Sequence, residues 1–91
     1  MEELEETLSI DEYLIDNKEA TFLLEVKGNS MKDDGIIAGD LIIVERGKTP
    51  RVNDIVIIEE NGEYKMKHFP KSSKKEIHVV AVVTAVVRKY K

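Results

Sequence analysis

The chain has 91 residues, of which 42% are hydrophobic, no cysteine and a formal net charge of −4. This length predicts a single domain whose apolar residues are sufficient for a packed core. The negative net charge argues against direct sequence-specific DNA binding, because contacts to phosphates need a basic surface. The lack of cysteine excludes disulfides, thiolate metal sites and a cysteine nucleophile. His68 and His78 have no carboxylates at ligand spacing, so we expect no metal and no cofactor.

The sequence shows no targeting signal. Four of the first six residues are glutamates, whereas a secretory signal starts with basic residues followed by an apolar run. The longest apolar stretch, residues 79–87, is much shorter than the roughly 20 residues of a membrane-spanning helix. We therefore expect a cytoplasmic protein without membrane contact, organised as an acidic N-terminal leader over residues 1–9 and one domain over residues 10–91.

The elements expected in chain order are one short helix followed by strands. Ser9 or Asp11 is a suitable N-cap for a helix that continues to about Asn17, with Ile10, Tyr13 and Leu14 directed to the core. Residues 30–37 indicate a turn or a single helical turn. Alternating or β-branched apolar residues predict the strands, over 21–27, 41–45, 55–59, 63–69 and 77–89. The fold class is therefore a mostly-β domain, a small bent sheet with one N-terminal helix.

Asn61-Gly62 separates two of these strands and is a strong signal for a two-residue β-hairpin turn. A two-residue turn makes Glu60 oppose Glu63, and therefore Val56 oppose Lys67. Opposed residues share one face of a hairpin, so Lys67 is expected among apolar neighbours. Loss of water there would favour the neutral amine over the charged one.

Ser30 lies in a glycine-flanked turn, Gly28-Asn29-Ser30-Met31, and Lys67 follows 37 residues later. A neutral lysine can remove the proton of a serine hydroxyl, so the two form a candidate Ser-Lys dyad with Ser30 as nucleophile and Lys67 as base. The backbone amides of Asn29 and Ser30 are candidate oxyanion donors. The structural alternative is that Ser30 is only a turn residue and Lys67 a solvated charge on a strand.

Several segments, in this order, resemble the LexA/UmuD family of Ser-Lys peptidases, and the start of the domain is most similar to the UmuD branch. The segments are residues 10–15, 20–22, 26–31, 34–36, 39–44, 54–56 and 62–67. The resemblance implies the family's bent β fold and assigns the nucleophile to Ser30 and the base to Lys67. It further implies a processed, UmuD′-like accessory subunit of a translesion DNA polymerase in the SOS response, with that polymerase or a RecA-type filament as protein partner.

The sequence departs from the family pattern at four points. Asn29 replaces an acidic residue before the serine, and His68 replaces a basic residue after the lysine. The connection between Phe69 and Ile77 is shorter than in the family, and this shortening would expose Lys67. No Ala-Gly or Cys-Gly bond precedes the domain, so we expect no self-cleavage of the chain as written.

Three alternatives remain open from the sequence. The chain can be the peptidase and dimerisation domain of a LexA-like or phage-type transcriptional repressor. It can be a catalytically inactive dimerisation module, so whether it is an enzyme stays open. Type I signal peptidases share the Gly-x-Ser-Met and lysine pattern, but no membrane anchor is visible. Residues 79–87 are apolar on both strand faces, which predicts a homodimer through the C-terminal strand.

Overall fold

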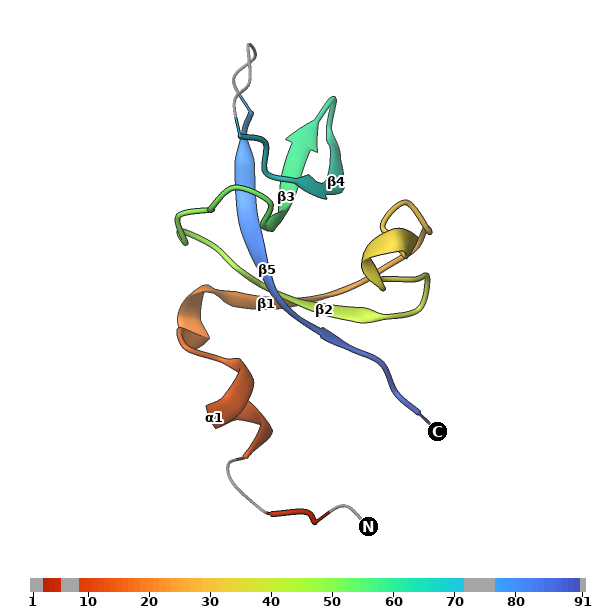
Figure 1. Cartoon of the computed structure of the whole chain (residues 1–91). Helices are drawn as coiled ribbons and strands as arrows, with labels where there is room; N and C mark the ends of the chain where they lie inside the picture. The colour runs from red at the N-terminus through yellow and green to blue at the C-terminus, as the bar shows by residue number, and fades with distance from the viewer. Residues whose placement is uncertain (1–2, 6–8, 72–76, 91) are drawn as a thin grey trace.

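The computed structural model describes residues 3–5, 9–71 and 77–90, and it places five antiparallel strands in one strongly bent sheet (Figure 1). The strands are β1 (Thr21–Glu25), β2 (Leu41–Glu45), β3 (Ile55–Glu60), β4 (Glu63–His68) and β5 (Val79–Val87). Their order across the sheet is β1-β2-β5-β3-β4. Strands β1 and β4 are therefore the two edges of an open sheet, and the mostly-β fold class is confirmed.

The N-terminal helix is shorter and more exposed than expected. Helix α1 (Ile10–Leu14) begins after Ser9, whose hydroxyl accepts a hydrogen bond from the Glu12 amide at 3.2 Å. The helix ends because Ile15 has an extended backbone. Ile10 is 76% exposed and Tyr13 is 72% exposed, so the expectation that they pack into the core was wrong. Leu14 is half-buried, and α1 projects away from the sheet (Figure 1).

The hairpin register expected from Asn61-Gly62 is confirmed. Both residues have a positive φ, 53° and 81°, as a type I′ turn requires. Glu60 opposes Glu63, and Val56 opposes Lys67. Strands β1, β4 and β5 are shorter than expected. The residues that were expected in these strands but lie outside them are 26–27, 69, 77–78 and 88–89.

The apolar residues form two clusters. The larger cluster includes Ile57 of β3 and two residues of the segment between β1 and β2, Met31 and Ile36. The smaller cluster is Val56, Ile58 and Val82. Because neighbouring residues of a strand point to opposite faces, Val56 and Ile57 place these clusters on the two faces of the sheet. The larger cluster anchors the segment that carries Ser30.

Candidate active site

Ser30 lies in the segment that connects β1 to β2, and backbone hydrogen bonds join the two ends of this segment. At its base, the Gly39 amide donates to the Val26 carbonyl and the Val26 amide to the Asp40 carbonyl, both at 2.8 Å. In its middle, the short 3-10 helix η2 (Lys32–Asp34) forms the single helical turn expected from the sequence. Ser30 is exposed, whereas its neighbour Met31 is buried at 7% exposure. Met31 therefore fixes the segment to the core while the Ser30 side chain stays accessible.

Asn29 braces the turn that presents Ser30. Its side-chain Oδ1 accepts a hydrogen bond from the Ala38 amide at 3.0 Å, across the mouth of the segment. Gly28 has no left-handed backbone, and a Cβ atom placed there would meet nothing within 4 Å. The backbone of Gly28 therefore does not require glycine, and the space beside it is open.

The amides of Asn29 and Ser30 donate no hydrogen bond among the residues that the structure describes. Both residues are exposed. Two neighbouring amides beside a serine hydroxyl are the donors that an oxyanion hole needs. Their availability is compatible with the expected oxyanion role, which stays a prediction.

A groove of about 530 Å³ runs past Ser30 between the two edges of the sheet. Leu24 and Glu25 of β1 line one side, and Tyr64, Lys65 and Met66 of β4 line the other. Since both edge strands border this groove, each offers unpaired backbone groups to an extended chain.

Lys67 is exposed, as the short connection after Phe69 predicted, and the desolvation expected from its apolar neighbours across the hairpin was wrong. Its strand position is as expected, opposite the fully buried Val56. However, β4 is an edge strand, and nothing in the described part of the chain covers Lys67. No hydrogen bond joins Ser30 to Lys67 within residues 9–71, and Lys67 is not among the residues lining the groove. The groove reaches its neighbours Lys65 and Met66 instead.

One ion pair links the segment of Ser30 to the strand of Lys67. His68 Nε2 lies 3.0 Å from Asp34 Oδ1. The pair joins η2 directly to the end of β4, one residue beyond Lys67. His68 thus has a structural partner, Asp34, that sequence reasoning missed.

A second ion pair clamps the same segment from the other side. Arg88, just after β5, donates to both carboxylate oxygens of Asp40 at 2.7 Å, and its Nη2 also donates to the Gly35 carbonyl at 2.8 Å. The Asp40 side chain is 2% exposed. The hydrogen bond from Arg88 and that from the Ile37 amide lower the pKa of Asp40 from 3.8 to about 2. The same bond raises the pKa of Arg88.

Two aspartates, Asp40 and Asp54, accept hydrogen bonds from backbone amides in turns, as aspartate commonly does. Asp40 Oδ2 accepts from the Ile37 amide at 3.0 Å, and Asp54 Oδ2 accepts from the Arg51 amide at 2.8 Å. The partnership with Arg88 had no local sequence signal, because the two residues are far apart in the chain.

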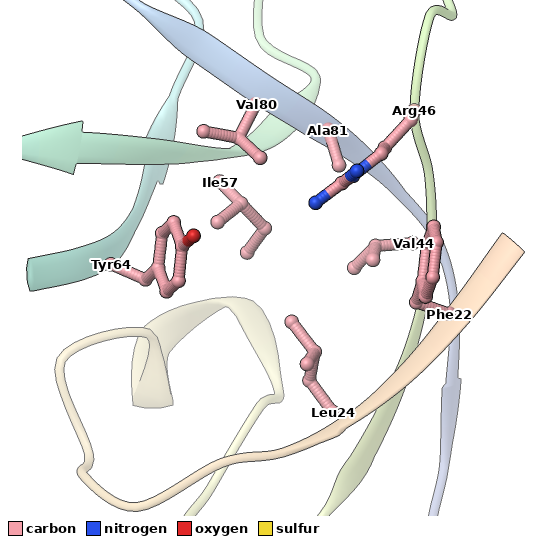
Figure 2. Close-up of a pocket in the computed structure, with 8 residues that line it drawn as sticks. All are labelled: Phe22, Leu24, Val44, Arg46, Ile57, Tyr64, Val80 and Ala81. Atoms are coloured by element: carbon pink, nitrogen blue, oxygen red, sulfur yellow. The ribbon is translucent and has the colours of Figure 1, made fainter. Parts of the chain in front are cut away.

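A smaller apolar pocket of about 130 Å³ continues the groove beyond Leu24 (Figure 2). It shares Leu24, Ile57 and Tyr64 with the groove. The Arg46 guanidinium stacks over the Phe22 ring at 4.9 Å from its centre and borders this pocket. In the described residues, no group of three or more potential ligand side chains is arranged to hold a metal ion. Among those residues, no helix is long and apolar enough to cross a membrane.

Comparison with known proteins gives a consistent family. The model of the Peptidase S24-like family matches residues 1–83. Protein SamA of Salmonella typhimurium is 33% identical over 93% of this chain and 71% of its own length. Protein ImpA of Escherichia coli is 41% identical over 69% of this chain and 43% of its own length. LexA repressor 2 of Geobacter sulfurreducens is 44% identical over 75% of this chain and 32% of its own length. The chain thus spans less than half of the last two relatives.

Proposed function

Because the chain belongs to the Peptidase S24-like family, as the LexA/UmuD resemblance predicted, we propose that it is a UmuD-like SOS-response protein with a Ser-Lys peptidase domain. The main observation that supports the proposal is the exposed position of Ser30, which lines a groove between the two edges of the sheet. The unengaged amides of Asn29 and Ser30 beside it support an oxyanion role.

In this proposal Ser30 attacks the scissile carbonyl and Lys67 takes its proton. A lysine removes the proton of a serine hydroxyl through its neutral amine. In the proposed complex, a bound peptide covers the exposed Lys67 at the edge of β4 and turns its amine toward Ser30. Catalytic hydrogen bonds that are long or absent without substrate commonly form in the complex.

The wider roles follow from the family and are part of the proposal. A protein of this kind acts in the cytoplasm as an accessory subunit of a translesion DNA polymerase and contacts a RecA-type filament. The alternative, a LexA-like repressor domain, is favoured by the 44% identity to LexA repressor 2. The match to SamA favours the first role, because it spans 93% of this chain and 71% of SamA.

We also propose a homodimer through the outer part of β5. Val82 is only 2% exposed and packs in the smaller cluster, so it is not an available contact. Val86 is 41% exposed, and Leu23 on the edge strand β1 is 60% exposed. Val86, near the end of β5, is the exposed apolar side chain that a second copy can cover, whereas the strand pairing places Leu23 on the opposite face of the sheet.

Cleavage in trans tests the peptidase proposal. A peptide with one Ala-Gly or Cys-Gly bond is incubated with the protein, and the products are identified by mass spectrometry. Ser30→Ala and Lys67→Ala should each lower the rate by at least about 10³-fold, since removal of one member disables such a unit. Lys48→Ala, on an exposed loop, is the control. Abolition by Lys65→Ala with activity retained in Lys67→Ala would contradict the assignment of the base.

A further inference from the structure

The apolar pocket beyond Leu24 is the feature that the catalytic proposal does not use. We propose that it binds one aliphatic side chain of an extended peptide lying in the groove, and that Arg46 pairs with an acidic side chain next to it. This inference rests on the proposed function, since it names the class of peptide that the same groove takes. The continuity between the pocket and the groove, which share Leu24, Ile57 and Tyr64, carries it.

The size and lining of the pocket select an aliphatic side chain. The pocket measures about 130 Å³, and its floor is formed by Val44, Ile57 and Ala81, each no more than 4% exposed. An apolar protein cavity of about 150 Å³ holds a molecule as large as benzene. One leucine, isoleucine or methionine side chain therefore fits. A charged side chain would lose its water without gaining a partner on this floor.

Arg46 supplies the charge at the edge of the pocket. Its guanidinium stacks on Phe22 and is directed into the space between Leu24 and Val80 (Figure 2). None of the ion pairs formed among the described residues includes Arg46. Stacking holds a planar guanidinium in place while leaving its N–H groups free for a carboxylate. An acidic residue beside the aliphatic one can meet this guanidinium.

The separation between Leu24 of β1 and Gly28, three residues beyond the end of that strand, sets the position of the aliphatic residue in the peptide. Leu24 borders the pocket and Gly28 borders the groove next to Ser30. Four residues of extended chain span about 13 Å at about 3.3 Å per residue. In the extended peptide, alternate side chains point the same way, so two of its residues at an even spacing can both face the groove. The aliphatic residue should therefore lie about four residues from the bond held at Ser30.

Peptide binding to the Ser30→Ala protein tests this inference without requiring cleavage. The probe is a fluorescein-labelled 12-residue peptide with one Ala-Gly bond and a Leu-Asp pair four residues from that bond. Its binding is measured by fluorescence anisotropy. Replacing the peptide leucine by alanine should weaken binding about tenfold or more, because the buried apolar surface is lost. This comparison uses one unaltered protein, so a folding defect cannot produce it. Equal binding of the two peptides would overturn the inference.

A charge exchange tests the part of Arg46. Arg46→Glu should weaken binding of the Leu-Asp peptide and improve binding of a Leu-Lys peptide. Lys48→Glu, nearby but outside the pocket, should leave the relative affinity for the two peptides unchanged. The same preference in both variants would overturn the role of Arg46. Selective binding by Ser30→Ala without cleavage by the unaltered protein would support the pocket and refute the peptidase. Cleavage that ignores the leucine would retain the peptidase and refute the pocket.

Discussion

Truncation of Ile36 is the strongest test of how core packing holds the segment that carries Ser30. Its side chain is 2% exposed and packs in the larger cluster with Met31. Truncating a buried isoleucine to alanine typically costs about 2 to 5 kcal/mol, from lost burial and the cavity left behind. Domains have only about 5 to 15 kcal/mol of stability in total. Ile36→Ala should therefore remove a large share of it.

The neighbouring Ile37 offers a matched control. It is 39% exposed, and its link to Asp40 uses the backbone amide, which alanine retains. Ile37→Ala should change stability by no more than about 0.5 kcal/mol. The two variants delete the same atoms, so only the difference in burial separates them.

Urea and thermal unfolding followed by circular dichroism measure both variants. For Ile36→Ala the urea midpoint should fall with an unchanged slope. Its melting temperature should fall by at least about 8 °C, since each kcal/mol moves a domain of this size by about 4 to 8 °C. An equal loss of unfolding free energy in the two variants would show that Ile36 does not anchor this segment.

Three further predictions concern the ion pairs and the dimer. Because the pKa of Asp40 is lowered to about 2, its pairing stabilises the fold above pH 3.8, and stability should fall as the pH drops from 3.8 toward 2. The stability of Arg88→Met should depend less on pH in this range. The same pH dependence as in the unaltered protein would contradict the pairing of Arg88 with Asp40. A double-mutant cycle on His68 and Asp34 should give a coupling of about 0.2 to 1 kcal/mol; zero coupling would show that the pair does not hold the segment. Val86→Glu should shift the protein toward monomer in sedimentation equilibrium with its fold intact, and an unchanged dimer would rule out this surface.

The sequence predicted those features that depend on local chemistry. Asn61-Gly62 determined the hairpin and its register because few residues tolerate a positive φ at two successive positions. The turn roles of Asp40 and Asp54 were predictable for a similar reason, since aspartate accepts bonds from nearby backbone amides.

Features that depend on tertiary packing were not predictable from the sequence. The helix pattern of Ile10 and Tyr13 suggested a core contact, yet a five-residue helix that projects from the sheet has no surface to bury them. The register placed Lys67 opposite Val56 correctly, but the apolar neighbours across the hairpin do not cover it, and its exposure agrees with the short connection after Phe69. Arg88 gave no signal because its partner Asp40 is brought to it only by the fold.

The distance from Ser30 Oγ to Lys67 Nζ in a complex tests the catalytic proposal most directly. A crystal structure with a peptide boronate bound to the serine would provide it, since the boronate occupies the position of the attacked carbonyl. We predict a distance of about 2.6 to 3.2 Å, with the groove closed over Lys67. A distance above about 8 Å with the hairpin intact would contradict the dyad, because neither a hydrogen bond nor a single bridging water spans it.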